Sequence, residues 1–255
     1  MTVRVERDGR GVATVWLDRP DMRNALTAAM MDDLSAFAAD PQARVAVLRG
    51  SGPMFCAGGD LRWMLDQMDA DPATRTREAW RLADMLRALN EMPVPLIGAV
   101  QGGAFGGGVG LACLCDVVVA TEDARFGLTE TRLGLIPATI APYVVARMGE
   151  GAARRVLMSS RRFDAGEART LGLVARVVPA AELDAAVEAE IAPYLDCAPG
   201  AVAAAKALVR RSGPRIDRAT VEAGVAALTE RWADPEAREG ISAFLEKRRP
   251  DWSPE

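Results

Sequence analysis

The sequence predicts an α/β fold followed by a helical C-terminal region, and two observations support this prediction. In the first half of the 255-residue chain, short β-branched runs alternate with segments whose apolar residues recur at helical spacing. Towards the C-terminus only helical patterns remain, separated by proline and glycine. We therefore expect two units, an α/β core over residues 1–190 and a helical region over residues 191–255.

Five short runs are expected to form buried strands, because each is rich in β-branched residues and bounded by glycine, proline or charge. They are residues 12–18, 44–50, 94–100, 116–122 and 173–178. Between the first four of these runs, residues 26–40 and 77–92 carry apolar side chains at helical spacing. Strands separated by helices favour parallel pairing with right-handed crossovers.

Four further helices are expected near the C-terminus, over residues 181–197, 201–212, 219–232 and 237–249. Their apolar faces exceed what a small appendage covers by itself. We therefore predict that they pack on neighbouring subunits.

Composition argues against several classes of function. With 50% hydrophobic residues and a net charge of −4, the chain is typical of a globular protein, and bulk charge does not favour a nucleic-acid partner. Only the local basic cluster at 246–250 has the charge to meet phosphates. No apolar run approaches the roughly 18 residues of a membrane span, and residues 1–11 carry charges and a strand-like alternation instead of a signal-peptide core. We expect a cytosolic protein without nucleic-acid or membrane partners.

The chain contains no histidine, which excludes Ser–His–Asp and Cys–His nucleophiles and zinc sites with imidazole ligands. Acid–base chemistry must therefore use carboxylates, tyrosine, cysteine or lysine. Four cysteines are too few for a disulfide scaffold in a chain of this length, and Cys113 and Cys115 are expected to fill the core. No metal site is expected.

Clusters of small residues occur at two places where an expected strand meets an expected helix. Gly106–Gly108 precede a helical run that starts at Val109, and Ala57–Gly59 precede another at residues 60–64. Glycine lets the backbone approach a ligand, and free N–H groups at a helix N-terminus attract negative charge. The first cluster completes neither a dinucleotide motif nor a P-loop. An oxyanion-type site and a tight packing turn both remain open, and two such turns can supply two N–H donors.

At these two turns the chain resembles the enoyl-CoA hydratase/isomerase (crotonase) family, whose marks stand here as FCAGGDL (55–61) and GGAFGGG (102–108). Residues 17–26 are similar to the family's N-terminal turn, residues 125–137 to its acidic segment and residues 239–252 to its C-terminal helix. The resemblance implies a crotonase-like spiral of ββα units with a C-terminal helical oligomerisation region. It also implies a homotrimer or a dimer of trimers.

The resemblance assigns catalytic roles to three residues. It implies that the backbone N–H groups of Gly59 and Gly107 hold the thioester oxygen of an acyl-CoA substrate, and that Glu130 is the acid–base group. A carboxyl group in an apolar pocket has a raised pKa, which suits it to shuttle a proton. Without the matched segment, Glu130 would be interpreted as a solvated surface charge.

The resemblance also implies contacts with the coenzyme A part of the substrate, so that no separate cofactor is expected. The residues concerned are Arg23, Ala25, Ala57, Asp60, Leu61 and Lys247. The ordinary alternative for the two cationic side chains is surface exposure.

Gly110 departs from the family pattern, because hydratases of this family usually place a second glutamate there to help hold the water. Two mechanisms remain open. A hydratase would hold the water with Glu130 and a polar group of the substrate or pocket. An isomerase would move a proton between 3-enoyl and 2-enoyl thioesters without water. The segments 60–64, 104–111 and 133–145 look most like methylglutaconyl-CoA hydratases, which favours hydration.

That subgroup acts on branched acyl chains with a distal carboxylate, which Arg62 or Arg132 could face, although surface exposure is the ordinary state of such residues. The candidates for lining the acyl pocket, with core packing as their alternative, are Met54, Trp63, Met64, Gly110 and Ile136. A third hypothesis is a catalytically silent homologue that binds CoA esters or RNA.

Overall fold

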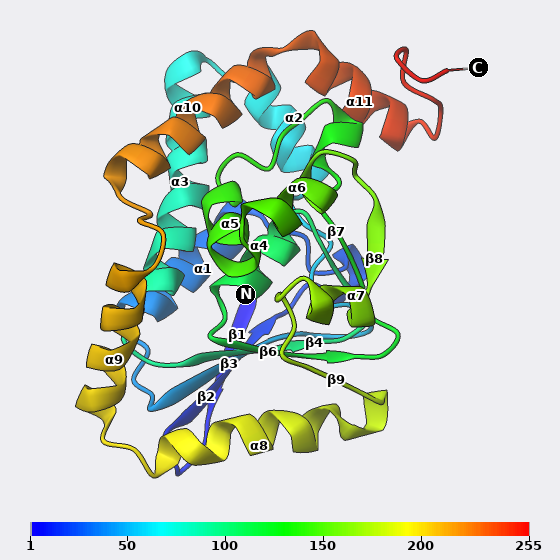
Figure 1. The fold of residues 1–255 in the computed structure, drawn as a ribbon. Coiled ribbons are helices and arrows are strands. Elements are labelled where there is room, and N and C mark those ends of the chain that lie inside the picture. The colour runs from blue at the N-terminus through cyan, green and yellow to red at the C-terminus, as the bar shows by residue number, and fades with distance from the viewer. Residues whose placement is uncertain (1, 255) are drawn as a thin grey trace.

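The computed structural model describes residues 2–254 and confirms the α/β fold. A six-stranded sheet runs in the order β1-β2-β3-β4-β6-β9 (Figure 1), and every strand pair is parallel except β1 with β2. Its strands are β1 (Val3–Arg7), β2 (Val12–Leu17), β3 (Val45–Gly50), β4 (Leu96–Val100), β6 (Val117–Thr121) and β9 (Arg176–Val178). All five predicted strands are therefore confirmed.

A second, smaller sheet was not predicted. It contains β5 (Gly103–Phe105), β7 (Arg125–Gly127) and β8 (Arg162–Asp164). Strands of three residues are too short to show an alternating pattern in the sequence. Their position nevertheless matters, because β5 leads directly into the glycine turn and β7 leads into the segment that carries Glu130.

Helices cover both faces of the large sheet. The helices before residue 175 are α1 (Ala28–Ala39), α2 (Leu61–Asp69), α3 (Pro72–Glu91), α4 (Gly107–Leu114), α5 (Ala141–Met148), α6 (Glu150–Leu157) and α7 (Ala165–Thr170). Short 3-10 turns are η1 (Pro20–Met22), η2 (Glu130–Leu133) and η3 (Ala180–Glu182). Along β3, Ala46 and Leu48 face the main core, whereas Val45 and Val47 face a second core. A strand buried on both faces explains its continuous apolar sequence.

The four C-terminal helices are confirmed as α8 (Leu183–Leu195), α9 (Pro199–Ser212), α10 (Arg218–Ala233) and α11 (Pro235–Leu245). Residue 190, the expected boundary, lies within α8. This helix closes the second core beneath the large sheet, as Figure 1 shows. α10 packs along α3, and α11 packs against α2 and η2. The same chain thus covers much of the apolar surface of these three helices, although Phe244 and Leu245 at the end of α11 stay exposed.

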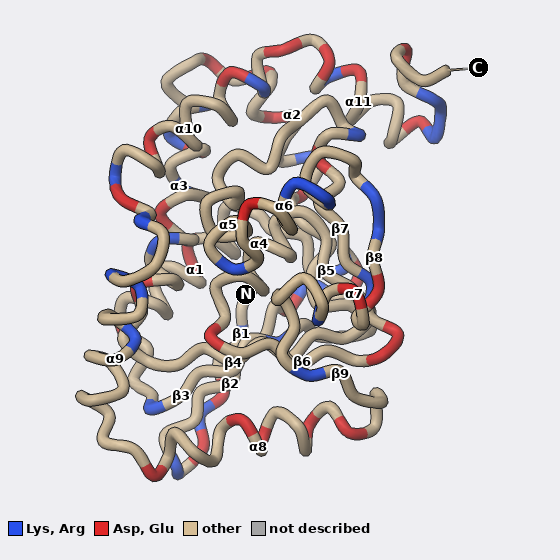
Figure 2. The backbone as a smooth tube through the Cα atoms, in the orientation of Figure 1, with Lys and Arg blue, Asp and Glu red and all other residues tan. Residues whose placement is uncertain are grey.

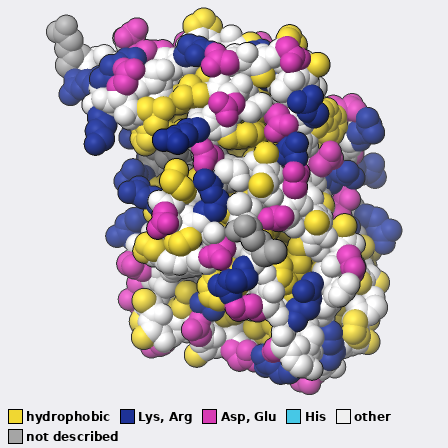
Figure 3. Space-filling view, turned by 180° about the vertical axis from the view of Figure 1, so that it is seen from behind, with side chains coloured by type: hydrophobic (Ala, Val, Ile, Leu, Met, Phe, Trp, Pro, Cys, Tyr) yellow, Lys and Arg dark blue, Asp and Glu magenta, His cyan; other side chains and the backbone are white. Residues whose placement is uncertain are grey.

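α9 differs from the other three, since none of its residues, all of which the structure describes, is fully buried. Leu208 and Val209 on this helix are exposed. Acidic and basic residues are interspersed along the whole backbone (Figure 2), and the face drawn in Figure 3 likewise mixes both signs of charge. Between residues 2 and 254, no helix is both long and apolar enough to cross a bilayer, and no cluster of metal-binding side chains occurs.

Candidate active site

The two turns of small residues lie against each other. Cys56 pairs with Ala104 through a parallel bridge, and the N–H of Phe105 donates to the carbonyl of Cys56 at 2.9 Å. A Cβ atom at Gly108 would lie only 2.5 Å from the Cys56 carbonyl oxygen, and one at Gly58 would lie 2.8 Å from that of Phe105. Glycine is required at both positions because the two backbones touch there.

Each turn presents a free backbone N–H group. Gly107 is the first residue of α4, and Gly59 directly precedes Asp60, the N-cap of α2. Among residues 2–254, neither N–H finds an acceptor in the chain. A Cβ atom at Gly107 would lie 3.8 Å from the nitrogen of Gly59, so the two groups are close neighbours. Two helix N-termini thus place their positive ends at one point, which suits an oxyanion.

Glu130 approaches the same point from the first residue of η2. Its Oε1 would lie 3.0 Å from a Cβ atom at Gly106, so a side chain at that residue would displace the carboxyl group. Its Oε2 is buried and has no hydrogen-bond partner in the described chain. Burial raises the pKa of Glu130 to about 7. The carboxyl group is therefore suited to accept and return a proton near neutral pH.

The turn that carries Glu130 is held from two sides. Ser160 Oγ accepts from the N–H of Arg132 at 3.0 Å and shares a 2.6 Å hydrogen bond with Thr131 Oγ1. On the other side, α11 lies so close that a Cβ atom at Gly240 would be 2.4 Å from the carbonyl carbon of Leu133. The C-terminal helices therefore help to position the acid–base group.

A cavity of about 40 Å³, with room for about three water molecules, joins these groups. Gly59, Gly107 and Glu130 all line it, as do three of the predicted acyl-pocket residues: Trp63, Met64 and Ile136. The other lining residues are Leu26, Met31, Leu82, Leu135, Pro137, Ala138, Thr139, Ile140, Leu228 and Trp232. The surroundings are almost wholly apolar, which explains the shifted pKa of Glu130.

Two of the residues predicted for the acyl pocket do not line this cavity. Gly110 does not line the cavity, because Ile140 packs against it, and a Cβ atom at Gly110 would lie 2.4 Å from Ile140 Cγ2. The space that a second glutamate would need is thus filled by an isoleucine. Met54 also lies outside the cavity, and its carbonyl oxygen accepts a hydrogen bond from Asn24 Nδ2 at 2.7 Å.

The two arginines considered as partners for a distal carboxylate do not reach the cavity. Arg62 and Arg132 are both exposed, and neither lines it. The ordinary alternative of surface exposure is therefore confirmed for both side chains.

Helix α10 was not predicted to reach the site, but it adds Leu228 and Trp232 to the cavity lining. The Trp232 ring meets the Trp63 ring edge to face, with centroids 5.4 Å apart and planes at 85°. Nothing in the sequence indicated this contact, because a tryptophan at helical spacing is typical of core packing. Only the path of the chain brings α10 back over α2.

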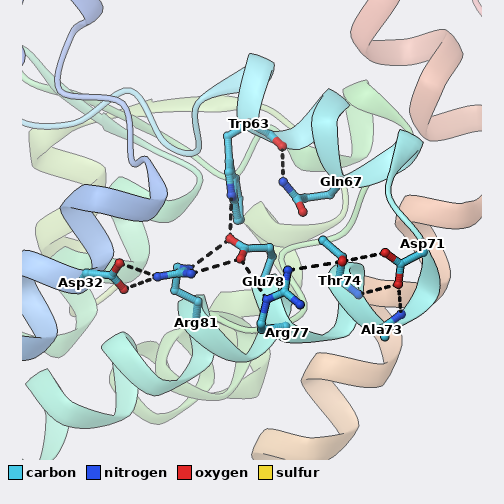
Figure 4. A network of polar contacts seen from close by, with 9 residues as sticks. All are labelled: Asp32, Trp63, Gln67, Asp71, Ala73, Thr74, Arg77, Glu78 and Arg81. Atoms are coloured by element: carbon cyan, nitrogen blue, oxygen red, sulfur yellow. Dashed lines mark hydrogen bonds and ion pairs between the residues drawn. The ribbon is translucent and has the colours of Figure 1, made fainter.

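Trp63 is fixed by a polar network that Figure 4 shows in detail. Its Nε1 donates to Glu78 Oε2 at 3.2 Å, and Arg81 donates to the same oxygen at 3.1 Å and also pairs with Asp32. Burial acts to raise the pKa of Glu78, but the hydrogen bonds from Arg81 and Trp63 and the nearby positive charges outweigh it and lower that pKa. The charged carboxylate therefore holds one indole of the cavity wall in place.

The residues expected to meet coenzyme A do not line the cavity; Ala57, Asp60 and Leu61 lie in or next to one of its turns, and Lys247 follows the end of α11. Asp60 uses its carboxylate to cap α2 and to pair with Arg19 at 3.1 Å, while its N–H donates to the Leu26 carbonyl. Both groups of Asp60 are engaged within the chain, which gives this residue a structural role. Leu61 is half-buried beside it.

Arg23 and Lys247 are exposed and have left-handed backbone angles, with φ of 52° and 56°. The carbonyl of Arg23 accepts from the N–H of Ala57 at 2.9 Å, which ties the N-terminal turn to the site. Ala25 is buried in that turn. The neighbouring Asn24 was not predicted to take part. It is fully buried, and its side chain donates to two carbonyl groups and accepts from the N–H of Arg19.

Comparisons with known proteins agree with this geometry. The family model for enoyl-CoA hydratase/isomerase matches residues 7–255. A putative enoyl-CoA hydratase of Thermus thermophilus is 36% identical over 94% of this chain and 96% of its own. The 2,3-dehydroadipyl-CoA hydratase of Escherichia coli is 37% identical over 94% of each chain. The crystal structure of a putative enoyl-CoA hydratase from Mycobacterium avium paratuberculosis superposes with a TM-score of 0.86 at 33% identity, covering 100% of both chains.

Proposed function

The chain belongs to the enoyl-CoA hydratase/isomerase family, and from that membership we propose that it is an enzyme that adds water to a 2-enoyl-CoA thioester. One observation carries the proposal. The N–H groups of Gly59 and Gly107 and the carboxyl group of Glu130 belong to residues that line one apolar cavity. Hydratases among the relatives support the same reaction.

In the proposed reaction, the thioester carbonyl oxygen accepts hydrogen bonds from Gly59 and Gly107. Glu130 takes a proton from water while the water oxygen bonds to Cβ. The electron pair of the double bond then moves through Cα towards the carbonyl oxygen and forms an enolate. The two fixed donors stabilise its negative charge, and one such donor contributes about 10²–10³-fold in rate. Glu130 finally returns its proton to Cα, so the enzyme ends as it began.

Isomerisation is the second candidate, and one observation favours it. Ile140 fills the place of a second carboxylate, which leaves Glu130 as the one acid–base side chain among the described residues that line the cavity. A single carboxylate is sufficient to move a proton between two carbons of a 3-enoyl thioester, because that reaction needs no water.

Turnover in ¹⁸O-labelled water separates the two reactions. We would incubate the protein with crotonyl-CoA and with a 3-enoyl-CoA, separate the products by chromatography against standards of both isomers, and analyse them by mass spectrometry. A hydratase gives a 3-hydroxyacyl product that contains the label, whereas an unlabelled 2-enoyl product formed from the 3-enoyl-CoA would establish the isomerase. Incubation with 3-methylglutaconyl-CoA would show whether a branched, carboxylated chain is accepted.

Glu130→Gln tests the acid–base group. We expect turnover to fall by about 10²–10⁴-fold, because the amide cannot accept and return the proton. Glu122→Gln is the matched control, since Glu122 is an exposed glutamate outside the cavity. Turnover retained by Glu130→Gln would remove Glu130 from its proposed role.

We further propose that the exposed cations Arg23 and Lys247 contact the phosphates of coenzyme A.

We also propose that the protein forms a homotrimer or a dimer of trimers. The exposed Leu208 and Val209 of α9 support this assembly, because they remain uncovered within the chain. Light scattering would test it, and a monomeric mass would contradict it. The cytosolic location and the absence of a separate cofactor stay predictions.

A further inference from the structure

Trp232, which lines the cavity together with Glu130, carries a hydrogen-bond donor that residues 2–254 do not use. Trp232 lines the cavity and is only 1% exposed. Its Nε1 is buried and has no acceptor among residues 2–254. An unpaired buried N–H lowers stability, so such a group in a binding cavity is typical of a site that a ligand completes.

The neighbouring indole shows the contrast. Trp63 donates its Nε1 hydrogen to Glu78 at 3.2 Å, and Figure 4 shows how Arg81 and Asp32 hold that carboxylate. The chain thus provides a partner for one of the two tryptophans in the cavity wall. Trp232 packs edge to face with this fixed ring, which restricts its own orientation. The unpaired donor is therefore held in a defined place before any ligand arrives.

The charge of the lining limits what this donor can bind. Besides Glu130, the lining includes Thr139 and otherwise apolar or glycine residues, and no lysine or arginine of the described chain is part of it. A carboxylate buried here would have no cation to balance it and would face a second acidic group, which is unfavourable. A hydroxyl or carbonyl oxygen can accept the N–H hydrogen without that cost.

We propose that the Trp232 N–H binds a neutral oxygen, a hydroxyl or carbonyl group, on the acyl chain of the substrate. This inference rests on the proposed function, because it assumes that the cavity receives the acyl chain of a CoA thioester. It replaces the distal carboxylate expected from the sequence with an uncharged oxygen. Trp232 thereby selects among substrates of one reaction and is not needed for the proton transfer itself.

Binding of saturated acyl-CoA thioesters tests the proposal without requiring turnover. Matched pairs would carry either a terminal methyl or a terminal hydroxyl group at C4, C5 or C6, and calorimetry would give each dissociation constant. We expect the hydroxyl form of at least one pair to bind about tenfold more tightly, because the methyl form leaves the N–H unpaired. The carboxylate-terminated chain of the same length should bind more weakly than both.

Trp232→Phe should abolish the hydroxyl preference and change the affinity for methyl-terminated chains by only a few fold. Tyr143→Phe is the matched control, because the Tyr143 hydroxyl is also buried and unpaired but lies outside this cavity, and it should keep the preference. Should Trp232→Phe fail to fold, replacing the indole by the isosteric benzothiophene amino acid removes the N–H alone.

Each outcome decides a definite point. Equal affinity within every pair, a preference that survives the loss of the N–H, or tight binding of the carboxylate form would overturn this inference. If the wild-type protein hydrates crotonyl-CoA but shows no preference for hydroxyl-terminated chains, the inference about Trp232 fails and the proposed function stands. Wild-type protein that binds no acyl-CoA would contradict the proposed function, and the inference would fail with it.

Discussion

Replacing Glu130 with glutamine should make the protein more stable at alkaline pH and leave its stability nearly unchanged in acid. Burial raises the pKa of Glu130 from 4.5 to about 7 in the folded chain. As pH rises through this interval, the unfolded chain loses this proton first, so the folded state is progressively destabilised. Glutamine does not ionise and therefore escapes the effect.

The size of the effect follows from the shift. Each pKa unit corresponds to about 1.4 kcal/mol, so a change from 4.5 to about 7 amounts to about 3 kcal/mol. We expect the variant and the wild type to have similar free energies of unfolding below about pH 4.5. Above about pH 7 the variant should be more stable by about 3 kcal/mol.

Urea unfolding followed by circular dichroism measures this difference at pH 4.5 and pH 8. Every other titrating group is shared by the two proteins, so the pH dependence of their difference isolates Glu130. Glu122→Gln should show no such dependence, because Glu122 is exposed. The reasoning is refuted if the difference between Glu130→Gln and wild type is the same at both pH values, or if the wild type is the more stable protein at pH 8.

Three further experiments test other parts of the structure. Gly110→Glu should lower the free energy of unfolding by about 1–3 kcal/mol without raising turnover, because the new side chain overlaps Ile140. Adding Ile140→Ala should restore part of that stability, and a gain in turnover by Gly110→Glu alone would contradict the packing of Ile140 against Gly110. Asn24→Ala should lower the free energy of unfolding, measured in urea, by about 2–3 kcal/mol, because two buried carbonyl groups lose their donor. A loss below about 1 kcal/mol would count against the role of Asn24 as their donor. Of the four thiols, only the exposed Cys197 should react quickly with a disulfide reagent in the native protein. Burial raises the pKa of each of the other three to about 12, so they stay protonated and unreactive. Fast reaction of a second thiol would contradict this expectation.

Local patterns determined much of the fold. The runs that form β2, β3, β4, β6 and β9 were recognisable because each is a short β-branched segment with clear boundaries. The clusters at Gly58 and Gly106 were recognisable because glycine is required where two backbones touch or φ is positive, and both residues have positive φ. These are properties of a few neighbouring residues, so the sequence alone was enough.

The composition of the cavity depends on contacts between distant segments, and only the tertiary structure decided it. Glu130 was indistinguishable from a surface charge until its Oε2 was seen to be buried and η2 was seen to pack against α11. Trp232 enters the lining from α10, more than 100 residues after Glu130, and Ile140 occupies the space beside Gly110. The spacing of apolar residues in a sequence indicates which residues of a helix or strand are buried, but it does not indicate which other segments cover them. Such partners are set by how the elements pack, because burial is a property of the whole fold.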